Sequence, residues 1–165
     1  MSTHAYTYNR SHTSIFAADN MRNILRDIIS WSSLDPTQLV DDWQVLGRAT
    51  QTWLQSGHLY QITIEFFLST SGKLVGRWDF PVAYDGSGVD GDMWVAREHV
   101  RRTIDKAGRP PAEANYEVIL WAHAGRAHVD GMGPAILRPT NGMVGRLSGT
   151  AIATPDIMVS LKYWR

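Results

Sequence analysis

Two stretches of alternating side chains, joined by a short turn, constrain the fold more than any other feature of the sequence. Residues 58–68 and 74–84 place apolar side chains at every second position, the period of a strand with one buried face. Residues 69–72 are typical of a tight turn. The pattern predicts an antiparallel hairpin, with Pro81 at an edge or a bulge because proline cannot donate to a strand ladder.

Three segments show the three- and four-residue spacing of amphipathic helices. The first spans about residues 13–29. The second is expected to begin with Asp35 as its N-cap and to end at Gly57, a plausible left-handed stop. The third is expected to begin with Asp92 as its N-cap and to end at Gly108.

The C-terminal quarter of the chain has no helical or strand period. Residues 124–165 hold six of the 14 glycines and three of the seven prolines, yet short apolar pieces are scattered through them. An irregular apolar segment of about forty residues at the end of a compact domain is typical of a functional lid or belt. Before it, residues 115–122 predict a third strand that is apolar on both faces, so a cover over the second face is expected.

These elements predict a single α+β domain over residues 1–165. We expect a polar N-terminal arm at residues 1–11, a core at residues 12–123 and a belt at residues 124–165. The belt carries five Lys and Arg residues against two Asp, whereas the rest of the chain carries 11 basic and 14 acidic residues. The belt is therefore expected to lie attractively, although weakly, on the body of the domain.

Composition excludes several classes of function. The 16 basic and 16 acidic residues cancel, which gives no reason to expect direct binding to nucleic acid. The absence of cysteine excludes disulfides, thiolate nucleophiles and cysteine-based zinc sites. Since no stretch approaches the roughly 20 apolar residues of a membrane span and the N-terminus lacks the apolar run of a signal peptide, we expect a cytoplasmic protein without a membrane partner.

No catalytic or metal-binding motif stands out. The acidic loop at residues 85–92 does not match a calcium loop, since Ala96 stands where the bidentate Glu is required. Neither a phosphate-binding loop nor a nucleophile elbow occurs. We therefore expect no catalytic residue, no metal, no cofactor and no enzymatic activity. One alternative is a small metal-dependent hydrolase that uses Asp85, Asp90, Asp92, His123 or His128.

Five segments, in this order along the chain, resemble the bacterial HORMA proteins encoded in CBASS-type antiphage operons. They are SLDPTQLVDDW (33–43), TWLQSGHL (52–59), GKLVGRWDF (72–80), KAGRPPAEANYEV (106–118) and TNGMVGRLSGT (140–150). The resemblance covers essentially the whole chain. It implies a HORMA fold, in which an antiparallel sheet backed by three helices is followed by a C-terminal safety belt.

The resemblance implies a peptide-binding conformational switch in antiviral defence. The belt of such a protein closes over a short closure-motif peptide, and the closed form activates a cGAS/DncV-like nucleotidyltransferase (CD-NTase) that makes a cyclic oligonucleotide messenger. A HORMA-remodelling AAA+ ATPase then reopens the protein by gripping its N-terminal arm, and a second HORMA protein is a candidate source of the peptide. Here the arm would be engaged through His4, Tyr6 and Tyr8.

The expected peptide contacts are apolar residues of the third strand and the belt. An extended peptide added to a sheet edge gains main-chain hydrogen bonds, and its alternate side chains give specificity. The expected contacts are Ile119, Trp121, Val144, Leu147, Ile152, Tyr163 and Trp164. A static protein-binding surface without a moving belt is the second alternative.

Overall fold

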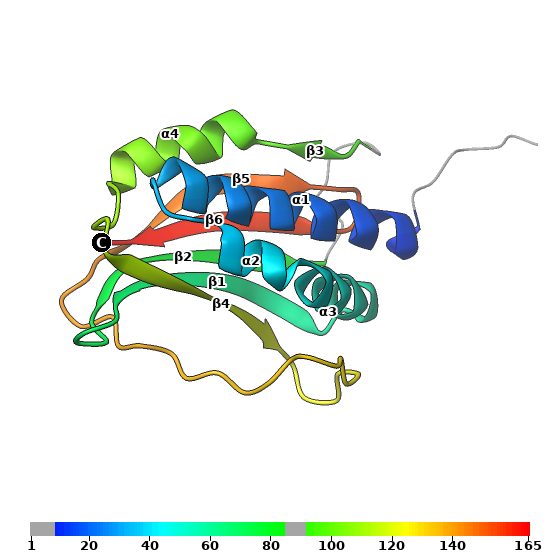
Figure 1. Cartoon of the computed structure of the whole chain (residues 1–165). Helices are drawn as coiled ribbons and strands as arrows, with labels where there is room; N and C mark the ends of the chain where they lie inside the picture. The colour runs from blue at the N-terminus through cyan, green and yellow to red at the C-terminus, as the bar shows by residue number, and fades with distance from the viewer. Residues whose placement is uncertain (1–8, 85–91) are drawn as a thin grey trace, which may run out of the picture.

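The computed structural model of the chain describes residues 9–84 and 92–165, which form an α+β fold (Figure 1). The helices are α1 (Arg10–Trp31), α2 (Thr37–Asp41), α3 (Trp43–Ser56) and α4 (Arg97–Ala107). The strands are β1 (Leu59–Leu68), β2 (Leu74–Ala83), β3 (Trp94–Val95), β4 (Ala114–Ala122), β5 (Gly145–Ala153) and β6 (Met158–Trp164).

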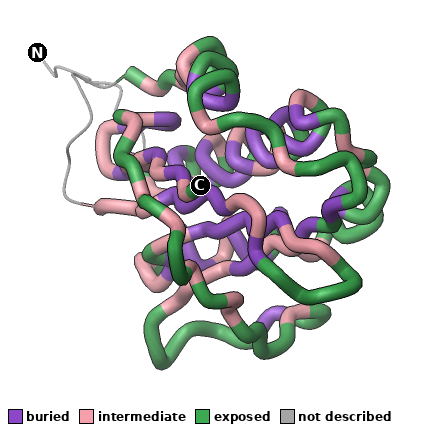
Figure 2. Tube along the Cα trace, turned by 90° about the vertical axis from the view of Figure 1, so that its left-hand side faces the viewer, coloured by how far each residue is buried: buried purple, intermediate pink, exposed green. Residues whose placement is uncertain are grey.

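All six strands belong to one antiparallel sheet in the order β3-β5-β6-β2-β1-β4. The predicted hairpin is confirmed, with Ile62 of β1 opposite Phe80 of β2. The helices lie on one face of the sheet (Figure 1), and the apolar stripe of α1, including Met21 and Ile28, is buried against it. Figure 2 shows buried positions gathered where the helices meet the sheet.

Pro81 lies in an interior strand, and not at an edge or a bulge of the sheet. β2 has β1 on one side and β6 on the other. The ladder between β2 and β6 is interrupted at this point: pairing stops at Asp79, opposite Lys162, and resumes at Val82, opposite Val159. The interior position arises because a segment from the far end of the chain pairs with β2, and the pattern of residues 74–84 contains no sign of that partner.

Two of the predicted helices differ from those in the structure. The second helix is divided into α2 and α3 at Asp42, which has φ −92° and ψ 8°. The third helix does not begin at Asp92, because Trp94 and Val95 pair with β5 as β3, and α4 starts only at Arg97. In that segment strand pairing prevails over a local capping signal. The first helix begins at Arg10, where the Asn9 side chain accepts a hydrogen bond from the His12 backbone.

The belt is more regular than its sequence predicts. Residues 145–153 and 158–164 form the antiparallel strands β5 and β6. The pairing of β5 with β6 shifts register on both sides of Thr150, and Gly149 has a φ of +83°. These irregularities interrupt the two-residue alternation of β5, so that strand could not be recognised from periodicity. β6 does alternate, with Val159, Leu161 and Tyr163 buried, so the expectation that the belt has no strand period is wrong there. The remaining part, residues 124–144, contains no helix or strand, and we call it the strap.

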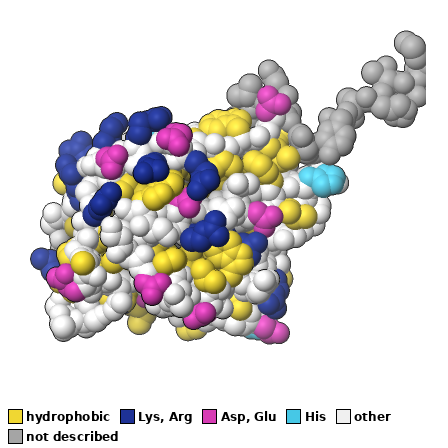
Figure 3. All heavy atoms as spheres, turned by 45° about the horizontal axis from the view of Figure 1, so that its top comes forward, with side chains coloured by type: hydrophobic (Ala, Val, Ile, Leu, Met, Phe, Trp, Pro, Cys, Tyr) yellow, Lys and Arg dark blue, Asp and Glu magenta, His cyan; other side chains and the backbone are white. Residues whose placement is uncertain are grey.

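The outward face of α4 is basic and solvated, as the position of Arg101 and Arg102 on its polar side indicates. Figure 3 shows Lys and Arg side chains gathered over this region, with acidic side chains among them. Arg97 forms an ion pair with Asp27 of α1 at 2.6 Å, and its guanidinium lies over the Trp31 ring. These contacts fasten α4 to α1.

Candidate functional site

β4 is the last strand at its end of the sheet. It pairs with β1 along its length, with Ile119 opposite Thr63, and within the described residues no other strand pairs with its outer edge. The strap passes beside this edge and then continues to β5, on the far side of β1, β2 and β6 (Figure 1). An unpaired strand edge presents a row of backbone donors and acceptors to any strand that can reach it.

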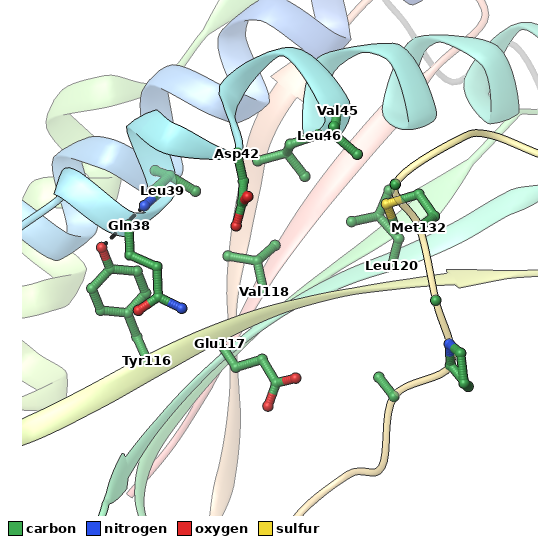
Figure 4. Close-up of a pocket in the computed structure, with 14 residues that line it drawn as sticks. Gln38, Leu39, Asp42, Val45, Leu46, Tyr116, Glu117, Val118, Leu120 and Met132 are labelled. Atoms are coloured by element: carbon green, nitrogen blue, oxygen red, sulfur yellow. Dashed lines mark hydrogen bonds between the residues drawn. The ribbon is translucent and has the colours of Figure 1, made fainter.

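A groove lies between the edge of β4, the α2–α3 junction and the strap. Its first part is a cavity of about 310 Å³ (Figure 4). A second cavity, of about 460 Å³, extends the groove toward Trp53 and Arg126. Both cavities are lined by Leu120, Met132, Gly133 and Pro134, so they are adjacent. We call this feature the β4 groove.

Aliphatic side chains line the first part of the β4 groove together with polar residues such as Gln38 and Asp42. Leu39, Val45 and Leu46 come from α2 and α3, whereas Val118 and Leu120 come from β4 (Figure 4). The Tyr116 hydroxyl fixes one end by donating to the Asp35 carbonyl at 2.8 Å and accepting from the Leu39 backbone at 3.2 Å. Burial is the largest influence on the pKa of Tyr116 and raises it.

The first turns of the strap are anchored to α3. The Trp53 indole donates a hydrogen bond to the Ala127 carbonyl at 2.8 Å, and Val129 is buried. Gly131 lies directly against Val45: a Cβ at this glycine would be 2.9 Å from Val45 Cγ2, and its φ is +92°. Only glycine permits both this conformation and this approach without strain.

The strap is anchored again where it passes the opposite face of the sheet, which we call the outer face. Arg138 donates to both carboxylate oxygens of Glu65, from its backbone N–H at 2.9 Å and from its guanidinium at 2.8 Å. The same guanidinium donates to Glu117 at 3.0 Å. Burial alone would lower the pKa of Arg138, but the hydrogen bonds and charges of Glu117 and Glu65 outweigh it and raise the pKa.

The C-terminal hairpin of β5 and β6 is anchored on the outer face by a second buried network. Asp79 of β2 accepts from the Trp164 indole at 2.8 Å, from Arg77 at 2.8 Å and from the Thr63 hydroxyl at 2.7 Å. Thr63 in turn accepts from the Trp121 indole at 2.9 Å. Two of the expected peptide-contact residues, Trp121 and Trp164, are thereby joined across four strands.

The other expected contact residues are not gathered at one place. Ile119 is buried on β4, beside Trp121 in the strand that borders the groove. Ile152 and Tyr163 are buried in the core beneath the C-terminal hairpin. Val144 and Leu147 are exposed, at 58% and 77%. His4, Tyr6 and Tyr8 lie outside the described residues, and the assignment of all these contacts stays a prediction.

The groove residues of α2 and α3 were not predicted as site residues. The helical spacing of Leu39 and Leu46 is that of an ordinary core stripe, and it places them correctly on the inner face of the helix. Val45, which lies beside that stripe and lines the groove, was a detectable signal, because it makes the apolar face wider than a buried stripe requires.

Metal and membrane alternatives receive no support from the described part of the chain. Residues 9–84 and 92–165 contain no cluster of three His, Cys, Asp or Glu side chains that could hold a metal ion. His128 lies 3.0 Å from Asp130, and both side chains are exposed, whereas His123 stacks on Tyr60. Asp85 and Asp90 lie outside the described residues. In the part searched, no helix meets the length and hydropathy needed to cross a bilayer.

A sheet with an open edge strand, bordered by a groove and a crossing strap, defines a protein-binding module. The family model of bacterial HORMA domain 2 matches residues 1–165. The chain therefore belongs to the bacterial HORMA domain 2 family. No curated protein matches its sequence.

Solved structures share the fold at low sequence identity. One chain of a mitotic checkpoint complex superposes with a TM-score of 0.73 at 9% identity, over 92% of this chain and 97% of that chain. C. elegans HTP-2 bound to the HIM-3 closure motif has a TM-score of 0.73 at 11% identity, over 96% and 92%. A chain of the E. coli MS115-1 HORMA:CdnC:Trip13 complex has a TM-score of 0.60 at 9% identity, over 100% and 98%.

Proposed function

We propose that this protein is a conformational switch that binds a closure-motif peptide along the edge of β4, underneath the strap. The observation that carries the proposal is the outer edge of β4, which faces the β4 groove and which no other strand pairs within residues 9–84 and 92–165. A guest in extended conformation would add a seventh strand and satisfy the open backbone groups. In this arrangement Ile119 and Trp121 contact or border the guest, whereas Ile152, Tyr163 and Trp164 hold the C-terminal hairpin on the sheet. Val144 and Leu147 stay predicted contacts.

The path of the chain would make such a guest difficult to release. The strap connects β4, at one end of the sheet, with β5. In the sheet, β1, β2 and β6 lie between these two strands. A strand inserted beside β4 would be enclosed between the sheet and the strap. Release then requires either threading of the peptide or detachment of β6 from β2, so we expect slow dissociation.

The attachment of β6 to β2 has features of a reversible contact. Pro81 interrupts the ladder between the two strands, and proline is normally confined to strands whose edge is free. β2 therefore has the composition of a strand that becomes an edge when β6 leaves. Two arrangements that differ by a few kcal/mol are sufficient for a peptide to select one of them.

The proposed partners are a CD-NTase and an AAA+ ATPase. The support is family membership and the HORMA:CdnC:Trip13 complex among the structural neighbours. In this proposal the peptide-bound form is not itself an enzyme; it binds and activates the CD-NTase, and the ATPase reopens it by pulling the N-terminal arm. Arg10, the first residue of α1, forms an ion pair with Asp156 in the turn between β5 and β6 at 2.5 Å, so a pull on the arm would reach the hairpin directly.

The test is a peptide selection followed by size-exclusion chromatography and dissociation kinetics. A switch yields an enriched peptide, two slowly interconverting forms of which the peptide selects one, and a dissociation rate that rises when Trp164→Phe loosens the attachment of β6 to β2. A static binding surface would show one form and a dissociation rate that this substitution leaves unchanged. A candidate CD-NTase should make its cyclic product only when both the protein and the selected peptide are present.

A further inference from the structure

We infer that α4 acts as a catch for the C-terminal hairpin: His99 and Thr103 hold Ser148 of β5, and this contact sets how long the hairpin stays docked on the sheet. We call the three residues the α4 catch. The inference rests on the proposed function, in which the guest is released when β6 detaches from β2. It adds a point of control far from the β4 groove, beyond β1, β2 and β6 in the sheet order.

β5 lacks a strand neighbour along most of its outer side. Trp94 and Val95 of β3 pair with Ala153 and Ile152, and within the described residues no strand pairs with the outer side of residues 145–150. α4 lies next to this first part of β5 (Figure 1). Since the open edge of a strand presents unpaired backbone groups, the helix takes the place that a neighbouring strand would occupy.

Both the hydroxyl and the carbonyl of Ser148 are engaged by α4. The Thr103 hydroxyl donates to the His99 carbonyl at 2.8 Å, which uses its only hydrogen. The Ser148 hydroxyl, whose oxygen is 3.0 Å from that of Thr103, must therefore be the donor in the bond between them. The Ser148 carbonyl accepts from the His99 ring, so Nε2 of His99 carries a hydrogen. Thr103 is buried, so water competes little for these bonds.

The α4 catch holds β5 at a bulge. Residues 147–150 of β5 face residues 160–162 of β6, so β5 contains one extra residue there. Gly149 has a φ of +83°, and a Cβ at this position would lie 3.3 Å from Nε2 of His99. Glycine permits both this conformation and this approach of the ring. Because a slip of one residue would turn Ile152 away from the core, a contact that holds the bulge also selects the register of the hairpin.

The α4 catch completes a second attachment of the hairpin to the domain. α4 is fastened to α1 by the ion pair of Arg97 with Asp27 at 2.6 Å, and its Val100 and Ile104 are buried in the core. On its other side the hairpin is held by the ladder between β6 and β2, which is interrupted at Pro81. Detachment of the hairpin requires both attachments to open. A contact that must break before release slows release and leaves the surface of the β4 groove unchanged.

The experiment is native-state hydrogen exchange of the full chain without peptide. His99→Ala removes the donor to Ser148, whereas His99→Gln places an amide N–H at about the same reach. Asp105→Asn is the matched control, since Asp105 is exposed on the same helix. The peptide enriched in the selection described above is then labelled, and its association rate and its dissociation rate into excess unlabelled peptide are measured for each variant.

His99→Ala should exchange about two- to tenfold faster than the wild type in residues 145–164, while β1 and β4 keep the wild-type rate. It should release the peptide faster by a similar factor, with an unchanged association rate. His99→Gln and Asp105→Asn should stay close to the wild type.

Wild-type exchange in His99→Ala, an acceleration spread evenly over the sheet, or no recovery in His99→Gln would overturn the inference and leave the proposed function intact. Faster exchange of the hairpin with an unchanged dissociation rate of the peptide would uphold the α4 catch, and it would overturn the proposed release of the guest through detachment of β6.

Discussion

The guanidinium of Arg138, in the strap, lies 2.8 Å from the carboxylate of Glu65, in β1, and Glu65 has no exposed surface. A second hydrogen bond, from the Arg138 backbone to the other oxygen of the same carboxylate, measures 2.9 Å. A fully buried carboxylate is tolerated only when it is paired and hydrogen-bonded. The position of the strap and the stability of the sheet are therefore coupled through this pair.

Substitution Arg138→Ala should destabilise the protein by about 3 kcal/mol, because it leaves the Glu65 carboxylate buried without its partner. Urea denaturation measures the loss. Hydrogen exchange should also become faster in residues 134–144, while β1 and β2 stay protected. Glu65→Gln combined with Arg138→Ala is the control, and it should recover most of the stability because no buried charge remains. A single Arg138→Ala variant as stable as the wild type would contradict the coupling.

Substitution Trp164→Phe should loosen the attachment of β6 to β2. It removes the indole donor that bonds Asp79 at 2.8 Å and retains the aromatic ring. A hydrogen bond to a charged group contributes about 1.5–3 kcal/mol, so we expect a loss in this range and faster hydrogen exchange in β6. Trp94→Phe is the matched control, since Trp94 is 40% exposed on β3. Equal effects of the two substitutions would indicate that the bond to Asp79 does not hold the hairpin.

Substitution Gly131→Ala should displace the strap from α3. The new Cβ would stand 2.9 Å from Val45 Cγ2, in a backbone conformation with φ +92°. We expect a loss of about 1–2 kcal/mol in stability and weaker peptide binding. The comparison is Gly133→Ala, two residues along the strap, where a Cβ would meet nothing within 4 Å. That substitution should change the free energy of unfolding by less than about 0.5 kcal/mol. Calorimetric unfolding distinguishes the two.

The ion pair between Arg10 and Asp156 should make the hairpin sensitive to acid. Burial would raise the pKa of Asp156, but hydrogen bonds from Arg10 and Thr13 and the charge of Arg10 hold the pKa below 3.8. A depressed folded-state pKa stabilises the protein above pH 3.8, and this contribution is lost as the pH falls through the lowered value.

The measurement is thermal unfolding of the wild type and Asp156→Asn between pH 7 and pH 2. The variant should be less stable at pH 7, by up to about 1 kcal/mol because the pair is partly exposed. The difference should shrink below pH 3.8 and vanish at the lowest pH. Asp105→Asn should match the wild type throughout, and a deficit of Asp156→Asn that persists at pH 2 would show that its cause is not the charge.

The local patterns of the sequence determined the hairpin of β1 and β2, the strand β4 and the buried face of α1. In each of these elements apolar residues recur along the face that packs on the core, and their period reports that face independently of the partner. The resemblance of five segments to bacterial HORMA proteins correctly indicated the family. The belt was recognised as a distinct segment because its composition differs from that of the core.

The tertiary structure alone decided which elements meet. Alternation puts Glu65 on the polar face of its strand, yet the strap crosses that face and buries the carboxylate completely. β5 is buried mainly at its end, Ala151–Ala153, and its pairing with β6 shifts register. Its residues therefore do not alternate between apolar and polar, and the sequence alone does not indicate this strand. The β4 groove likewise joins α2, α3, β4 and the strap from distant parts of the chain. Such contacts depend on the topology of the sheet, and no local period encodes topology.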